Sequence, residues 1–307
     1  MKIGIVDLDT SHPQNWIPIE RELGHDVVGV WDGGSVHPRS YVDQFARDKG
    51  LGPVYGSLEE LARDVDAAII HGCDWDTHVA KARPFIEAGK GVLLDKPMAG
   101  CLRDIRQLQA WVDGGARITG GSSLRFCVET REWMGQPLEE RGTPHTALCG
   151  CAVDEFNYGI HAYALLNGIL GPGARSVRHL GGSLQRRALV RWEDGRTGVV
   201  VMGAAAAYHP FHATVVTDRT VAHYQPDAGK LYRALLESVL PYLEGSEPPP
   251  MPFAALVEPE LAAIAAMQSW TEGGREVRLD ALGEGGYDGA GFAQGYRLMR
   301  YPEGASA

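Results

Sequence analysis

The sequence predicts a two-domain α/β protein, with a doubly wound parallel sheet of the Rossmann type followed by an α+β domain with an open antiparallel sheet. Its 307 residues exceed what one hydrophobic core usually organises. Short β-branched runs alternate with helical patterns through the first 120 residues. After the glycine pair at residues 120 and 121, strand patterns follow one another with little helix between them. We therefore expect domains at residues 1–120 and 121–307.

The first domain is predicted to contain five short buried strands, at Ile3–Leu8, Val27–Trp31, Ala67–His71, Val92–Leu94 and Ile118–Thr119. Helices are expected between them, over His12–Leu23, Tyr41–Lys49, Thr77–Ala88 and Leu102–Val112. A further short helix begins after Ser57, whose spacing to Glu60 is typical of a capping box. Strands and helices that alternate in this way favour a mostly parallel sheet with helices on both faces.

The second domain begins with a helix near Val128–Glu140, a strand at Thr146–Cys151 and a helix at Tyr158–Leu170. Strands are then predicted at Val177–Leu180, Ala188–Trp192, Gly198–Met202, Ala213–Thr217 and Thr220–Tyr224. Such a series is typical of an antiparallel sheet. Two helices, Lys230–Leu243 and Ala255–Thr271, follow it.

Composition excludes several classes of function. The formal net charge is −10 and lysine and arginine form no cluster, so a nucleic-acid partner is not expected. No apolar run approaches the roughly 20 residues that span a bilayer, and a membrane association is not expected either. The five cysteines are scattered and the first residues do not resemble a signal peptide. We therefore expect reduced thiols and a cytoplasmic location.

The turn after the first strand is where a dinucleotide-binding fold carries Gly-x-Gly-x-x-Gly, but residues 7–12 read DLDTSH. The usual glycines let the backbone approach a pyrophosphate at the helix N-terminus. Asp7 and Asp9 bring negative charge to this place, whereas Thr10 and Ser11 offer hydroxyl and backbone donors. We predict that Asp9, Thr10, Ser11 and His12 contact the cofactor; alternatively, Asp9 or Ser11 only caps the helix.

Asp32 follows the second strand, 25 residues after Asp7. An acid at this place binds the hydroxyls of the adenosine ribose, and it favours NAD over NADP. The neighbouring Arg39 leaves NADP possible. The alternative is a turn acid that precedes Gly33 and Gly34.

Several stretches resemble the glucose–fructose oxidoreductase / inositol dehydrogenase / MocA family (Gfo/Idh/MocA). They are Val65–Ile70, then His78, then Ala88–Ala99, in which Asp95-Lys96-Pro97 stands where the family more often has Glu-Lys-Pro. Asn157–His161 is similar to the family's Asp-x-Gly-x-His helix start, and Gly273–Leu279 to its closing Gly-Arg-x-Val-x-Leu strand. The similarity runs through nearly the whole chain in the family's order, and residues 7–12 mark a divergent branch.

The resemblance implies an NAD(P)-dependent oxidoreductase that transfers a hydride between nicotinamide and a small polyhydroxylated or carbonyl-bearing substrate, such as a sugar or cyclitol. It also implies homo-dimers or homo-tetramers that assemble through the sheet of the second domain. Two alternatives stay open. One is a redox-neutral enzyme that oxidises its substrate transiently, and the other is a cofactor-free binding or sensor protein on the same scaffold.

The resemblance assigns the reaction to residues of both domains. Lys96 matches the family's lysine beside the nicotinamide, where an ammonium group would polarise a substrate oxygen or relay a proton. His161 matches the proton-transferring histidine, a task that suits imidazole because its ordinary pKa is near neutrality. Asn157 replaces an aspartate, so it can bind substrate or orient His161 but cannot accept a proton. Asp154 or Glu155 is a possible source of the missing carboxylate.

Further contacts follow from position. Arg125 and Tyr158 are expected to bind substrate, and Asp74 and His78 belong to the loop expected near the nicotinamide. Metal binding was weighed for Asp7-x-Asp9-x-x-His12 and for Asp74-x-Asp76-x-His78, but neither has a recognised ligand spacing, so no metal is expected. A Ser-His-Asp triad built from Asp9, Ser11 and His12 is disfavoured, since neighbours on one turn do not reach that geometry.

Overall fold

A computed structural model describes residues 1–182 and 184–302 of the chain, which form two compact units. The first unit contains Met1–Gly121, Leu236–Phe253 and the segment that begins at Asp288. The second contains Ser122–Leu235 and Ala254–Tyr287. The chain thus leaves the first unit next to residue 120, as expected. Two later segments, Leu236–Phe253 and the one that begins at Asp288, belong to the first unit, although we expected them in the second domain.

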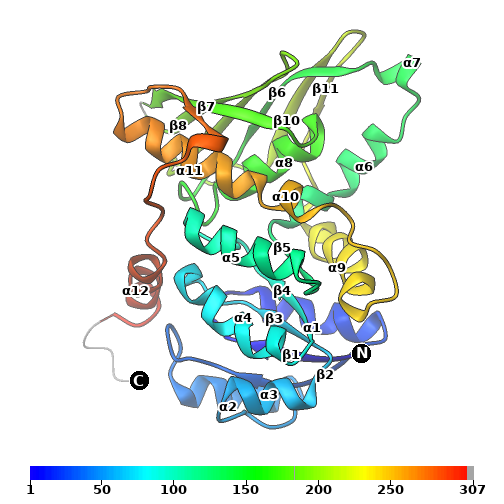
Figure 1. The fold of residues 1–307 in the computed structure, drawn as a ribbon, viewed down its shortest axis with the longest axis vertical. Helices are drawn as coiled ribbons and strands as arrows, with labels where there is room; N and C mark the ends of the chain where they lie inside the picture. Colours follow the sequence, from blue (N-terminus) through cyan, green and yellow to red (C-terminus); the bar gives the residue numbers. More distant parts are fainter. Residues whose placement is uncertain (183, 303–307) are drawn as a thin grey trace. The chain divides into compact units, whose positions relative to one another are not determined.

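The first unit contains the expected parallel sheet. Its five strands are β1 (Lys2–Val6), β2 (Asp26–Trp31), β3 (Ala67–Ile70), β4 (Gly91–Leu94) and β5 (Ile118–Gly120). They pair in the order β2-β1-β3-β4-β5, and every pair is parallel (Figure 1). The strand order changes direction between β1 and β3. In open sheets of this kind, ligands bind at the carboxyl ends of the strands at that point.

Helices connect these strands: α1 (His12–Glu22), α2 (Arg39–Asp48), α3 (Leu58–Asp64), α4 (His78–Glu87) and α5 (Leu102–Asp113), with the 3₁₀ turn η1 (Trp75–Thr77) before α4. The Ser57 Oγ accepts a hydrogen bond from the Glu60 N–H at 3.2 Å, so the predicted cap of α3 is confirmed. Pro13 occupies the first turn of α1, where its missing N–H costs nothing.

The helix α12 (Gly289–Arg300) was not predicted from the sequence. It contains Gly289, Gly291 and Gly295, and glycine lowers helix propensity by about 1 kcal/mol per residue relative to alanine. Two features compensate for this. The Asp288 side chain caps the first turn by accepting from the Gly291 N–H at 2.8 Å, and Phe292 and Tyr296 stack one turn apart.

The second unit is a seven-stranded sheet covered by helices. Its strands are β6 (Pro144–Gly150), β7 (Ala174–Gly182), β8 (Arg186–Trp192), β9 (Thr197–Met202), β10 (His212–Thr217), β11 (Val221–Tyr224) and β12 (Val277–Arg278). Their order is β11-β10-β6-β9-β8-β7-β12, and all pairs except β6 with β9 are antiparallel. The expected antiparallel sheet is confirmed, with one parallel pair that the sequence did not indicate.

Two of the helices predicted in this region are each replaced by two shorter helices, and a proline lies at each division. In place of one helix near Val128–Glu140 there are α6 (Val128–Met134) and α7 (Leu138–Arg141), because Pro137 disfavours helical backbone at the residue before it. In place of Ala255–Thr271 there are α10 (Phe253–Leu256) and α11 (Glu258–Thr271), with Pro259 in the first turn of α11. The remaining elements are α8 (Ile160–Leu170), α9 (Ala228–Glu244) and the 3₁₀ turns η2 (Ser123–Phe126) and η3 (Leu279–Ala281).

Within the described ranges no helix combines the length and apolarity needed to cross a membrane.

Candidate functional site

The turn after β1 begins with Asp7, which adopts the left-handed conformation (φ 64°) that glycine usually supplies. Its carboxylate points into the protein. One oxygen lies 2.6 Å from the Lys81 Nζ of α4, and the other accepts a hydrogen bond from the Gly33 N–H at 3.0 Å. Both side chains of the ion pair are buried. Burial lowers the pKa of Lys81, but Asp7, with smaller contributions from Asp9 and Asp74, outweighs burial and raises that pKa above its ordinary value, so the lysine is charged.

Asp9 is also turned inward. Its carboxyl is fully buried, and one oxygen accepts a hydrogen bond from the Cys73 N–H at 2.9 Å. Burial raises the pKa of Asp9 from 3.8 to about 7, and the charge of Asp7 adds to the increase. Neither acid of this turn therefore presents its carboxylate to a ligand at the surface.

The backbone of the same turn offers donors. Within the part of the chain that the structure describes, the N–H groups of Asp9, Thr10 and Ser11 have no hydrogen-bond acceptor. They lie at the N-terminus of α1, where oriented N–H groups and the helix dipole favour a negative ligand. The Ser11 side chain makes no capping bond, and Thr10 Oγ1 accepts from the His12 N–H at 3.2 Å instead. The turn therefore fits a pyrophosphate group, although it lacks the glycines.

Asp32 stands directly after β2, as predicted. One carboxylate oxygen accepts from the Leu8 N–H at 2.9 Å and the other from the Gly34 N–H at 2.7 Å. Burial and the neighbouring Asp7 raise the pKa of Asp32. The side chain thus ties the end of β2 to the phosphate turn. Arg39, the residue that kept NADP possible, is exposed and pairs with Asp43 one turn along α2 at 2.7 Å.

The helix α12 covers the loops that follow β2 and β3. Phe292, Ala293 and Tyr296 pack against Val36 and Cys73. Polar contacts join the same surfaces. The Gly289 N–H donates to Asp76 at 2.9 Å, and the Arg297 guanidinium donates to the Gly34 carbonyl at 3.1 Å. The Tyr301 hydroxyl lies 2.7 Å from the His37 Nδ1. These loops border the place where the adenosine of a dinucleotide is expected, so a helix already lies beside it.

Asp74 and His78 belong to the loop and helix that follow β3. Asp74 caps η1 by accepting from the Asp76 N–H at 3.2 Å. His78 is fully buried, and its two ring nitrogens lie 3.1 Å from the Met98 carbonyl oxygen and 2.8 Å from the Gly72 carbonyl oxygen. The His78 ring therefore connects this loop to the segment after β4.

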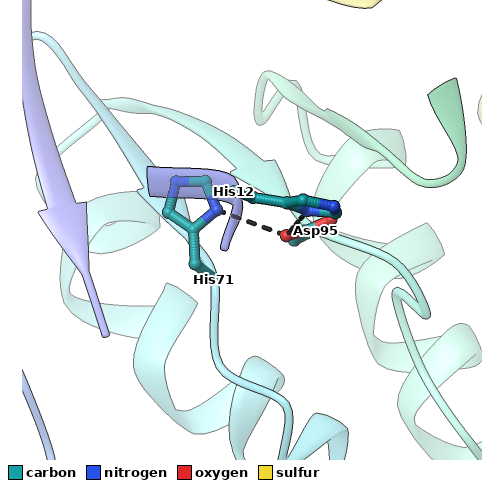
Figure 2. A group of neighbouring side chains, drawn as sticks. All are labelled: His12, His71 and Asp95. Carbon is teal, nitrogen blue, oxygen red and sulfur yellow. Dashed lines mark hydrogen bonds and ion pairs between the residues drawn. The ribbon is translucent and has the colours of Figure 1, made fainter. Parts of the chain in front are cut away.

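A group of polar side chains lies at the carboxyl ends of β1, β3 and β4, formed by His12, His71 and Asp95 (Figure 2). The His12 Nδ1 is 2.5 Å and the His71 Nδ1 is 3.3 Å from the same carboxylate oxygen of Asp95. Burial alone would raise the pKa of Asp95, but the two imidazoles hold it well below its ordinary value of 3.8. No role was predicted for His71 from the sequence. Lys96, the residue after Asp95, is largely buried and precedes a cis proline.

In the second unit, His161 lies in the first turn of α8, and its side chain is 6% exposed. Its Nδ1 is 2.6 Å from the Ser122 Oγ, and the rings of Tyr158 and Phe211 pack against it at 5.2 and 5.0 Å. The structure thus brings together two of the residues predicted for catalysis and substrate binding, and it adds Ser122, which the sequence did not indicate.

Asn157 lies in the turn before α8, because the helix begins at Ile160 and not at Tyr158. Its amide nitrogen is 3.5 Å from an oxygen of Asp154, whose other oxygen accepts from the Phe156 and Tyr158 N–H groups. Asp154 therefore shapes this turn.

Glu155 is paired with a cation, whereas Arg125 is a buried cation that two glutamates influence electrostatically. Glu155 forms an ion pair with Arg186. Burial lowers the pKa of Arg125 to about 10, while Glu258 and Glu260 favour its charged form. No other described side chain accepts from its NH1 group. Arg125 thus keeps a buried donor that a ligand oxygen would satisfy.

Comparison with known proteins agrees with this geometry. Residues 2–118 match the family model described as an oxidoreductase family with an NAD-binding Rossmann fold, Gfo/Idh/MocA. Over these residues the chain is similar to that family. A trans-1,2-dihydrobenzene-1,2-diol dehydrogenase of Oryctolagus cuniculus is 38% identical over 87 residues, which are 28% of this chain and 25% of that protein. The chain thus matches only a quarter of this relative's length.

Solved structures of several dehydrogenases share the fold across both units. The scyllo-inositol dehydrogenase of Lactobacillus casei with bound NAD(H) and scyllo-inositol superposes with a TM-score of 0.76 at 14% identity, over 91% of this chain and 99% of that one. The UDP-N-acetylglucosamine 3-dehydrogenase of Acidithiobacillus ferrooxidans superposes with a TM-score of 0.72 at 14% identity, over 88% and 97%. The predicted fold class is therefore confirmed, and the Gfo/Idh/MocA model describes a domain that binds NAD, the predicted cofactor.

The ion pair between Asp7 and Lys81 yields a first prediction. Lys81→Met should lower the free energy of unfolding by about 3–5 kcal/mol, because it leaves the buried Asp7 carboxylate without its cation. Asp7→Asn combined with Lys81→Met should recover most of that loss, since the amide oxygen still accepts from Gly33. Urea unfolding measures both, with Arg83→Met on the exposed face of α4 as the control. Equal losses in the single and double variants would contradict a charge-based role.

Asp9 predicts a pH dependence of stability. Its pKa is about 7 in the fold and 3.8 when exposed, so the folded state holds an extra proton between these values. Stability should therefore fall as pH rises from about 4 to about 7, by at most about 1.4 kcal/mol per pH unit. Asp9→Asn should remove this slope, whereas Glu20, whose pKa burial raises to about 8, contributes equally to both proteins. The measurement is the unfolding midpoint of the wild type and of Asp9→Asn, each at pH 5 and at pH 8. If the midpoint changes between the two pH values by the same amount in both proteins, the prediction is refuted.

Proposed function

We propose that this protein is an NAD(H)-dependent dehydrogenase or reductase that acts on a small polyhydroxylated or carbonyl-bearing molecule. The observation that carries the proposal is the phosphate turn. Three unpaired N–H groups stand at the N-terminus of α1, and both neighbouring carboxylates are turned inward. A dinucleotide pyrophosphate is the ligand that such a turn accepts in a Rossmann domain. The similarity to dehydrogenases of cyclic diols and inositols supports the substrate class.

The cofactor would be held by the turn at Asp9–Ser11 and by Asp32. The carboxylate of Asp32 has lone pairs beyond the two that it uses on Leu8 and Gly34, and these suit the ribose hydroxyls. It would repel a 2′-phosphate, whereas Arg39, the nearby cation, is paired with Asp43. These features favour NAD over NADP.

When bound, nicotinamide accepts or supplies a hydride. The chain's own part is to move a proton and to stabilise charge on the substrate oxygen. Lys96 suits the second task, because a largely desolvated ammonium interacts strongly with a developing oxyanion. His161 suits the first, since Ser122 and two aromatic rings fix the orientation of its imidazole. Asn157, Tyr158 and Arg125 would bind the substrate's hydroxyl or carbonyl oxygens.

One observation favours a second candidate, a binding protein that has lost the cofactor. The helix α12 packs on the loops beside Asp32 and presents Phe292 and Tyr296 there. If α12 replaces adenosine, no nicotinamide dinucleotide will bind.

Titration of the purified protein with NAD⁺, NADH, NADP⁺ and NADPH by calorimetry separates the two candidates. We expect micromolar dissociation constants for NAD(H) and at least about tenfold weaker binding of NADP(H). Asp32→Ala should weaken NAD binding about tenfold, because it removes hydrogen bonds worth roughly 1.4 kcal/mol. Asp48→Ala, on the exposed end of α2, is the control. No binding of any form at millimolar concentration would leave the binding-protein candidate.

Turnover tests the assignment of the reaction. On the best substrate from a screen of polyols, cyclitols and their ketones, Lys96→Met and His161→Asn should each lower kcat by about 100-fold or more, the usual contribution of a positioned acid or base. Both variants should keep the NAD affinity of the wild type in calorimetry. Unchanged kcat in either variant removes that residue from the mechanism.

A further inference from the structure

His12, His71 and Asp95 converge from three separate segments of the first unit. His12 begins α1, His71 follows β3, and Asp95 follows β4. One ligand atom from each lies within 4.8 Å of the other two (Figure 2). The carboxyl ends of parallel strands meet at one edge of the sheet, which is how residues 59 and 24 positions apart become neighbours.

The three side chains are held in an arrangement that presents donors to a common point. Both imidazole Nδ1 atoms face the Oδ2 of Asp95, at 2.5 and 3.3 Å. The other carboxylate oxygen, Oδ1, is occupied, because it accepts from the Lys96 N–H at 2.7 Å. Trp16 fixes both rings: His12 stacks on it with centroids 5.2 Å apart, and His71 meets its edge at 5.0 Å.

The buried carboxylate of Asp95 is met by histidine side chains. The described residues place no lysine or arginine side chain within ion-pair distance of it. Its partners are the two imidazoles and one backbone N–H. A buried carboxylate is stable only when it is paired or coordinates a metal ion, and the two imidazoles place nitrogen atoms where they can share one cation with it.

We propose that His12, His71 and Asp95 bind one divalent transition-metal ion of the zinc class. Two imidazole nitrogens and one carboxylate oxygen suit Zn²⁺, Co²⁺, Fe²⁺ or Mn²⁺, whereas Mg²⁺ and Ca²⁺ prefer oxygen ligands alone. Three protein ligands leave at least one coordination position open, as in catalytic metal sites and unlike closed structural ones. His12 is the least buried ligand at 9% exposed, so an exogenous ligand reaches the ion past His12.

The proposed ion needs no cofactor in order to bind, although His12 is also a predicted cofactor contact, and the site differs from the two acidic motifs of the sequence. In those motifs Asp7 is occupied by Lys81 and Gly33, Asp9 by Cys73, and His78 by two carbonyls. Only His12 of the six residues enters the cluster. The expectation that no metal binds followed from spacing within single loops, whereas the ligands here are distributed over three.

The test uses the full-length protein after dialysis against a chelator. Zn²⁺ and Co²⁺ should each bind with one equivalent per chain in calorimetry, and Co²⁺ should give a visible d–d absorption that Zn²⁺ abolishes. Mg²⁺ should not compete at millimolar concentration. X-ray absorption at the zinc edge should show two imidazoles and at least one oxygen. Binding of less than about 0.1 equivalent by the folded wild type would overturn the proposal.

Variants locate the ion. His12→Gln and Asp95→Asn should each weaken Co²⁺ binding by at least about 100-fold, since even outer-sphere changes cost 10–100-fold. His145→Gln, an exposed histidine on β6, is the matched control and should bind like the wild type. If Asp95→Asn fails to fold, the least buried ligand variant, His12→Gln, still decides. Unchanged affinity in a folded His12→Gln protein would place the ion elsewhere and refute the site.

Discussion

The buried ion pair between Asp7 and Lys81 is the interaction on which the nucleotide side of this protein depends. Asp7 takes a left-handed backbone conformation, which glycine usually supplies. An aspartate there would repel a phosphate, but Lys81 draws its carboxylate inward at 2.6 Å and neutralises it. The same carboxylate accepts from the Gly33 N–H, and its charge adds to the burial that raises the pKa of Asp9 to about 7. One lysine on α4 thus makes an acidic turn compatible with an anionic ligand.

Most of the fold could be predicted from the sequence because its signals are local. Buried β-branched runs such as Ala67–Ile70 and the Ser57 cap depend on a few neighbouring residues, and both were placed correctly. The errors lie where tertiary contacts override local preference. The glycine-rich α12 forms because Phe292 and Tyr296 pack against an apolar surface at Val36 and Cys73. The sequence of residues 289–300 alone does not indicate that surface. The parallel pairing of β6 with β9 is likewise a long-range choice.

The candidate site was predictable only where residues follow a motif. Lys96 and His161 were predicted through the family resemblance of the motifs that contain them, and Asp32 through its place after the second strand. Lys81 and His71 were missed because their roles arise from charge and burial, not from spacing. A signal did exist for His71, since a polar residue directly after a buried parallel strand points to the ligand edge of the sheet. Asp95 also directly follows a buried parallel strand, but it was predicted only to replace the glutamate that the resembled family has more often at this position.

That departure has a physical consequence. Aspartate has one methylene less than glutamate, so its carboxylate stays close to the end of β4, where the imidazoles of His12 and His71 reach it. The acids at the ends of β1 and β2 are each satisfied by Lys81 or by backbone N–H groups, as the bonds of Asp7 and Asp32 show. Among the described residues, one backbone donor and two imidazoles contact the Asp95 carboxylate. The sheet edge thus has one part beside the phosphate turn, where lysine and backbone groups hold the acids, and another part where two imidazoles hold the acid and form the proposed metal site with it.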